Sequence, residues 1–327
     1  MSMRIPLALA FGIFAIGLVL SAFLSDYNLR LLNLSVIAAV AVIGLNFAFG
    51  YAGLISLSHA AFVGMGAYGV AILTTKFGWL PWLAVPVAIG ITVVFSALIG
   101  FPLLRLRGHY LALATLGLNV AFYIVATNWI ELTGGTNGIA RIPELSFLGY
   151  PLADERSFLW FGLGVLGVLA AGASLIHRSR YGRAMMAVRD DEIASEMTGI
   201  NTTVVKIAAF ALAAGCAAVA GCLFAFHVRF VAPEDFNYAH SITYLAMLIV
   251  GGEGSIVGAI LGAIVLTFLP EWLRFLGTAY LAFFGLLMLG ILIFLPTGIV
   301  GLGRFLPWRR PKRPAAILGV RSTEVSS

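Results

Sequence analysis

LLNLSVIAAVAVIGLNFAFG, residues 31–50, is a run of twenty consecutive residues without a charged side chain. A helix needs about 20 mainly apolar residues to cross the hydrocarbon core of a bilayer. The rest of the chain has the same character, because 61% of its 327 residues are hydrophobic and only 10% are charged. A soluble domain carries about a quarter charged residues. Lipid must therefore be the solvent for most of this protein.

Apolar stretches of this kind follow one another along the chain. They cover residues 5–24, 31–50, 54–75, 80–103, 109–130, 157–177, 204–228, 238–252, 255–270 and 279–296. The third is rich in Gly and Ser and carries His59, so we expect it to be broken or re-entrant, with protein or a water-filled cavity covering its backbone. The sequence predicts an all-α polytopic membrane protein of about ten transmembrane helices. Residues 1–303 form the membrane domain, and residues 304–327 form a basic tail that we expect to be disordered.

Positive charge sets the orientation, because Lys and Arg accumulate in cytoplasmic loops. If both termini are cytoplasmic, fourteen of the twenty Lys and Arg residues lie in inner segments. The short basic start and apolar run of the first segment also fit a signal peptide. We expect it to be retained as a helix, since it is long for a signal and lacks a small-x-small cleavage site.

The chain lacks the motifs of nucleotide hydrolysis and of common enzymes. None of its lysines follows a glycine, so the phosphate-binding loop GxxxxGK[ST] is missing. GMGAYG, residues 64–69, matches the dinucleotide pattern GxGxxG, but it lies inside an apolar span and predicts a small-residue surface for close helix packing. Cys216 and Cys222 lie in an apolar run without metal-ligand spacing, and we expect them to be packing residues.

Ionisable side chains are rare inside the predicted spans, and His59 is the clearest case. Carriers driven by ion or proton gradients usually keep buried carboxylates or His relays in their helices. This scarcity argues against a secondary carrier, although backbone carbonyls that bind sodium leave that class open.

SRYGRAMMAVRDDEIASEMTGI, residues 179–200, concentrates charge in a predicted cytoplasmic loop. Together with Arg178 it holds eight of the chain's charged side chains. Apolar residues recur at three- and four-residue steps from 183 to 197, which predicts one short amphipathic helix. Arg189 is placed to pair with Glu192 one turn on, and Gly199 suits a left-handed C-terminal cap.

This amphipathic helix has alternative interpretations. It could lie on the lipid surface or be a solvated loop without a partner. A lipid-surface helix favours Trp, Phe or Leu with mostly basic polar residues. The Ala, Val, Ile and Met of this segment, with charges of both signs, fit a groove on another protein better.

Four segments together resemble the LivM-type permease subunit of branched-chain amino acid ABC importers. They are GYAGLISLSHAAFVGMGAYGVAIL (50–73), YLALATLGLN followed by LTGGTNGI (110–139), SRYGRAMMAVRDDEIASEMTGIN (179–201) and GGEGSIVGAILGA (251–263). They occur in the expected order over most of residues 40–300, and the combination is specific although each piece alone is weak.

The resemblance implies a multi-pass protein of the bacterial cytoplasmic (inner) membrane that works in a complex. The implied partners are a second, LivH-type permease, two P-loop ATPase subunits, an extracytoplasmic binding protein and membrane lipid. No cofactor is expected in this chain, because the partner ATPases bind ATP. A coupling helix over about residues 181–199 would enter a groove of an ATPase. Its matching residues are Tyr181, Gly182, Arg183, Ala187, Arg189, Glu192 and Gly199.

Two further sets of residues are weaker functional candidates. Residues that could line the translocation pathway are Asn46, Ser56, Ser58, His59, Thr115 and Asn119, although hydrogen bonding between helices is the commoner role of such residues. A loop that could contact the binding protein comprises Thr133, Gly134, Gly135, Thr136, Asn137 and Gly138, and it could also be a simple tight turn. The family commonly has glycine at the position of Ser58, which weakens a substrate assignment there. The tail PWRRPKRP fits anionic lipid headgroups, and no nucleic-acid partner is expected.

The resulting hypothesis is a non-enzymatic permease subunit of a binding-protein-dependent, ATP-driven importer for leucine, isoleucine and valine. The alternatives are the same importer class acting on urea, amides or other small amino or carboxylic acids, and a self-contained secondary carrier or channel. No metal site is expected.

Overall fold

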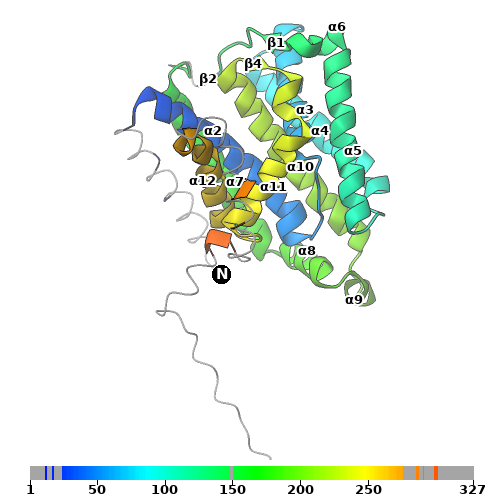
Figure 1. Ribbon diagram of the computed structural model, residues 1–327. Helices are drawn as coiled ribbons and strands as arrows, with labels where there is room; N and C mark the ends of the chain where they lie inside the picture. Colours follow the sequence, from blue (N-terminus) through cyan, green and yellow to red (C-terminus); the bar gives the residue numbers. More distant parts are fainter. Residues whose placement is uncertain are drawn as a thin grey trace, which may run out of the picture.

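A computed structural model of the chain describes residues 24–147 and 150–274, together with 12, 17, 285–286, 290 and 298–300. Most of this part is helical (Figure 1). The α-helices are α2 (Asp26–Leu45), α3 (His59–Thr75), α4 (Pro81–Leu103), α5 (His109–Asn128), α6 (Ile130–Thr133), α7 (Glu155–Arg178), α8 (Arg180–Asp190), α9 (Glu192–Met197), α10 (Thr202–Val228), α11 (Tyr238–Gly251) and α12 (Ile256–Trp272). Apart from the isolated positions, the first and last predicted spans and the basic tail lie outside the described residues.

Apart from the short α6, α8 and α9, the described α-helices fall on the predicted spans. Five of those helices are long and apolar enough to cross a membrane: α2 with its continuation to Tyr51, α4, α5, α7 and α10. The shorter apolar helices α3, α11 and α12 occupy the third, eighth and ninth predicted spans. This agreement confirms an all-α polytopic membrane fold for the described part of the chain.

Loops predicted to share one side of the membrane lie at the same end of the molecule. The short helices α8 and α9 lie at the bottom of Figure 1, where Arg107 of the α4–α5 loop pairs with Glu192. At the opposite end, β1 (Ile139–Ala140) pairs antiparallel with β4 (Phe230–Val231) close to α6. A second small pair joins β2 (Ser146–Phe147) to β3 (Tyr150–Pro151). The alternation agrees with the topology that the charges predict.

Helix α10 is the central helix, and it packs against α2, α3 and α4. Its contact with α3 depends on small residues, because a Cβ atom at Gly66 would overlap the Ala218 carbonyl and one at Gly221 would overlap the Val63 carbonyl. Such close approach is how helices gain packing energy in lipid. The interpretation of GMGAYG as a helix-packing surface is therefore confirmed.

The third predicted span is interrupted, as expected from its composition. Helix α2 continues into a π-helix, η1 (Asn46–Tyr51), and α3 does not begin until His59. The backbone of residues 52–58 between them is largely buried and irregular. Irregular backbone at membrane depth is tolerated only under such cover.

The prediction of a single helix over residues 183–197 is wrong, because the chain forms two helices, α8 and α9, with a break at Asp191. Asp191 is extended, with φ −157°, and its carboxylate accepts a hydrogen bond from Ala194 N at 3.0 Å. A short acidic side chain favours this N-cap over the helix interior. The cap predicted at Gly199 is confirmed by its φ of +86°.

Candidate functional site

Buried polar side chains from three elements meet where α3 begins. Thr115 Oγ1 of α5 accepts a hydrogen bond from Leu57 N at 3.0 Å. Asn119 Nδ2 donates to Leu57 O at 3.3 Å and to Ser241 Oγ of α11 at 2.7 Å. Ser241 Oγ in turn accepts from Ala60 N at 2.9 Å. These bonds satisfy backbone groups that the interrupted helix leaves open.

Three residues of the interrupted span itself complete this polar cluster. The hydroxyls of Ser56 and Ser58 lie 3.0 Å apart, and His59 Nε2 lies 2.7 Å from Ala41 O. All three side chains are buried. The structure therefore brings together five of the six residues that the sequence suggested for the pathway.

Asn46 is the sixth residue, and it lies elsewhere, at the start of η1. Its Oδ1 accepts a hydrogen bond from Gly254 N, in the turn between α11 and α12, at 2.9 Å. Its Nδ2 is buried and has no hydrogen-bond partner among the described residues. Asn46 thus connects two helical segments far apart in the sequence.

Sequence reasoning missed Ser241, although its hydroxyl bonds two other segments of the cluster. A lone serine within an apolar helix has no spacing or motif that marks it. Only the meeting of α3, α5 and α11 reveals its role.

The short helices α8 and α9 carry exposed apolar side chains. Tyr181, Ile193 and Met197 are 60%, 60% and 84% exposed, and we call these three residues the docking face. On the opposite side, Gly182 and Met185 are buried. Contiguous exposed apolar surface often marks a site that binds another protein or a membrane.

The predicted Arg189–Glu192 pair does not form. Arg189 Nη1 instead donates to Gly50 O of η1 at 2.5 Å, and its Nε lies 3.6 Å from Asp190 Oδ1. The extended backbone at Asp191 removes the helical spacing that would bring Arg189 and Glu192 together.

Glu192 pairs with two cations outside its own segment. Its carboxylate lies 2.5 Å from Lys206 Nζ of α10 and 3.4 Å from Arg107 Nε of the α4–α5 loop. The Lys206 side chain is only 8% exposed. A cavity of about 230 Å³ lies beside these pairs, lined by α8, α9, residues 52–55 and the α4–α5 loop. The ion pairs join the cytoplasmic helices to the membrane helices.

The loop of residues 133–138 lies at the opposite end of the molecule (Figure 1). Its three glycines all have positive φ, between 61° and 78°. Thr133 Oγ1 donates to the α5 carbonyl of Ala126 at 2.7 Å, and Thr136 and Asn137 are exposed. The tight turn expected here is confirmed, and its tip is open to contact.

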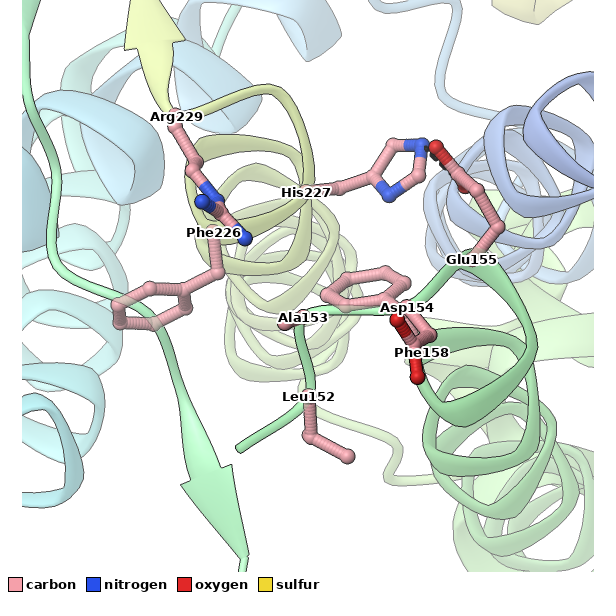
Figure 2. A pocket seen from close by; sticks show the side chains of 8 residues that line it. All are labelled: Leu152, Ala153, Asp154, Glu155, Phe158, Phe226, His227 and Arg229. Carbon is pink, nitrogen blue, oxygen red and sulfur yellow. Dashed lines mark ion pairs between the residues drawn. The ribbon is translucent and has the colours of Figure 1, made fainter. Parts of the chain in front are cut away.

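A small cavity of about 20 Å³ lies beneath this end, where α7 begins and α10 ends. Figure 2 shows the His227 ring turned towards the Glu155 carboxylate, and Nε2 lies 3.7 Å from Oε2. Asn33 Nδ2 donates to the same carboxylate oxygen at 2.8 Å. This cluster joins α2, α7 and α10 and leaves room for about one water molecule.

Within the described part of the chain, no group of three or more His, Cys, Asp or Glu side chains is arranged to hold a metal ion. The polar chemistry there consists of hydrogen bonds and ion pairs that link helices.

Comparisons with known proteins give a consistent result. The family profile described as "Branched-chain amino acid transport system / permease component" matches residues 27–296. The chain is 34% identical over 303 residues to the "High-affinity branched-chain amino acid transport system permease protein LivM" of Salmonella typhimurium, which covers 86% of this chain and 70% of that protein. LivM of Escherichia coli (strain K12) has the same identity and coverage. The "Autoinducer 2 import system permease protein LsrC" of Salmonella paratyphi B is 30% identical over 64% of this chain and 63% of that protein. No solved structure matches the chain.

Proposed function

The chain belongs to the family of permease components of branched-chain amino acid transport systems, and on this basis we propose that it is the membrane-spanning subunit of an ATP-driven importer for leucine, isoleucine and valine. The family match over residues 27–296 carries this proposal. The apolar helices agree with a permease, and a permease component is the part of a transporter that forms the path through the membrane.

In this proposal the chain crosses the bacterial cytoplasmic membrane ten times, and both of its termini lie in the cytoplasm. The end that carries α8 and α9 faces the cytoplasm, since most of the Lys and Arg residues belong to segments of that side. The opposite end, with α6 and the β1–β4 pair, faces outward. The pathway follows the interrupted third span, where the polar cluster holds the irregular backbone in place. Asn46 holds the preceding η1 against the α11–α12 turn.

We propose different partners for these two ends of the molecule. Two ATPase subunits bind and hydrolyse ATP, and one of them receives α8 and α9 through the docking face. A second, LivH-type permease completes the membrane part. Because the ATPases bind the ATP, this chain needs no cofactor of its own. A binding protein delivers substrate to the outer end, where Thr136 and Asn137 are exposed.

An alternative is the same importer class acting on urea, amides or other small amino or carboxylic acids. The similarity to an autoinducer 2 import permease supports testing several substrate classes. A self-contained carrier or channel is the remaining alternative. It predicts flux without ATP and a chain that purifies alone.

Co-purification tests the proposal directly. The chain is tagged, extracted from its own cells in mild detergent and analysed by mass spectrometry for associated subunits. We expect two ATPases with phosphate-binding loops and a second permease, and we expect the associated binding protein to bind leucine, isoleucine and valine. A chain that purifies alone and transports leucine in liposomes without ATP would contradict the proposal.

A further inference from the structure

We propose that Arg189 is a positioning residue that transmits movement of α8 to the interrupted span by capping the carbonyl end of the α2–η1 helix. Its Nη1 donates to Gly50 O at 2.5 Å, between residues 139 positions apart. This inference rests on the proposed function, in which α8 and α9 are the coupling helices. It assigns Arg189 to the membrane side of α8 and not to the surface that meets an ATPase.

The end of η1 has open carbonyl groups that need partners. The last carbonyls of any helix have no partner within that helix. Two of these oxygens are satisfied by the following chain: Phe49 O accepts from Gly53 N at 3.1 Å, and Ala48 O accepts from Leu54 N at 2.8 Å. Gly50 O is satisfied by Arg189. A guanidinium also suits this position electrostatically, because the C-terminal end of a helix carries partial negative charge.

The space around Arg189 is shaped to receive it. A Cβ atom at Gly53, whose φ is +68°, would lie 2.8 Å from Arg189 Cγ. A larger residue at Gly53 would therefore displace the Arg189 side chain from the end of η1. A Cβ atom at Gly50 would instead overlap Asn46 Oδ1 and lie 2.8 Å from Gly254 N, so Gly50 allows η1 to approach the α11–α12 turn.

The contact continues from η1 into a third element. Asn46, at the start of η1, accepts a hydrogen bond from Gly254 N in the α11–α12 turn. Arg189 therefore reaches a short π-helix that is bonded to that turn and that leads directly into the irregular residues 52–58. π-Helices occur often at functional sites. A shift of α8 thus acts on a segment that leads into irregular backbone.

The transport stoichiometry of Arg189→Gln tests this assignment. The importer, with its ATPases and binding protein, is reconstituted in liposomes, and leucine uptake and ATP hydrolysis are measured together. Because the docking face is unchanged, we expect the ATPases to remain bound and to hydrolyse ATP. We expect leucine transported per ATP to fall about 5-fold or more. Arg189→Lys, which keeps a cationic donor, should recover part of the loss.

Two further variants separate this role from general damage. Gly53→Ala should lower the same ratio, because its methyl group displaces Arg189. Arg105→Gln makes the same chemical change at the same end of the molecule, but the Arg105 guanidinium lies over the Phe101 ring of α4, 4.7 Å from its centroid. We expect Arg105→Gln to leave the ratio unchanged. Loss of the ATPases from Arg189→Gln, or an unchanged ratio in that variant, would overturn the inference.

Hydrogen exchange of the isolated permease tests the Arg189–Gly50 contact directly, and its result does not depend on which substrate the importer carries. Loss of the cap should speed exchange of the Gly53 and Leu54 amides about 10-fold in Arg189→Gln, and Arg105→Gln should resemble the wild type. Equal exchange in all three proteins would overturn the inference. A wild-type complex that shows this exchange pattern but transports no leucine would contradict only the proposed substrate.

Discussion

Lys206 Nζ of α10 lies 2.5 Å from Glu192 Oε1 of α9, although the Lys206 side chain is only 8% exposed. The pair ties the long apolar helix α10 to the short helix α9. Arg107 adds a second cation to the same carboxylate at 3.4 Å. One carboxylate of α9 thus meets cations from both α10 and the α4–α5 loop, and Glu196 adds a second link to α10 by accepting a hydrogen bond from Thr202 Oγ1 at 2.7 Å.

We expect Glu192→Gln to lower the thermal stability of the purified permease. The change leaves the nearly buried Lys206 ammonium without its anionic partner, which costs about 2 kcal/mol. The double variant Glu192→Gln with Lys206→Met should regain most of this loss, because no unpaired charge remains. The measurement is the midpoint of thermal unfolding in detergent. A double variant as unstable as the single variant would show that the unpaired Lys206 charge is not the cause of the lower stability.

We expect Thr115→Val to destabilise the fold without changing the apparent affinity for substrate. Valine has nearly the same shape, but it cannot accept the hydrogen bond from Leu57 N. The unsatisfied amide costs about 1–2 kcal/mol. Thr92→Val is the matched control, since Thr92 is also fully buried and its hydroxyl donates to Ala88 O of its own helix. A raised KM for uptake with unchanged stability would instead place Thr115 in the substrate path.

The sequence predicts the membrane helices well because lipid imposes one length and one polarity on all of them. The fourth predicted span covers residues 80–103, and α4 runs from Pro81 to Leu103. The break before α3 was also predictable, since Gly and Ser weaken a helix there. These features depend on local composition, which the sequence displays directly.

The contacts between distant segments were not predictable in the same way. The Arg189–Gly50 hydrogen bond and the Glu192–Lys206 ion pair depend on how the helices pack. The periodicity of apolar residues in the sequence does not show which helices pack together. The break at Asp191 was missed because RDDE continues a helical pattern. The capping of α9 by the Asp191 carboxylate decides the local structure instead.

We expect Ile193→Ser with Met197→Ser to weaken binding of the ATPase subunits. These docking-face side chains are 60% and 84% exposed, so their loss removes contact area without disturbing the core. Burying an apolar side chain of this size contributes about 1.5–3 kcal/mol. The measurement is the amount of ATPase that co-purifies with the permease. Leu106→Ser is the control, because Leu106 is 41% exposed in the α4–α5 loop and lies outside α8 and α9. Equal recovery of ATPase from both proteins would contradict the assignment.

The raised pKa of Asp235 predicts a contribution to the stability of the folded protein that changes with pH. Burial raises its pKa above the ordinary value, and the hydrogen bond from Ala232 N opposes that shift, as does the charge of His240. Because the folded-state pKa is raised, the stability from this group is present in acid and is lost as pH rises through the folded value. Asp235→Asn keeps an acceptor for Ala232 N and removes the charge. We expect its melting temperature to exceed that of the wild type near neutral pH and to converge with it in acid. A constant difference at all pH values would contradict the assignment.

Gly138 and Gly78 have the same φ of +66° but differ in their surroundings, which makes them a matched pair. A Cβ atom at Gly138 would overlap the Val231 carbonyl oxygen and push β1 away from β4, whereas a Cβ atom at Gly78 would meet no atom within 4 Å. Gly78→Ala should therefore cost only the backbone strain, about 1–2 kcal/mol. Gly138→Ala should lose more stability and should also reduce the stimulation of ATP hydrolysis by the binding protein, because the loop at the outer end is displaced. The measurements are thermal unfolding and ATP hydrolysis with increasing binding protein. Equal behaviour of the two variants would show that the β1–β4 contact does not position this loop.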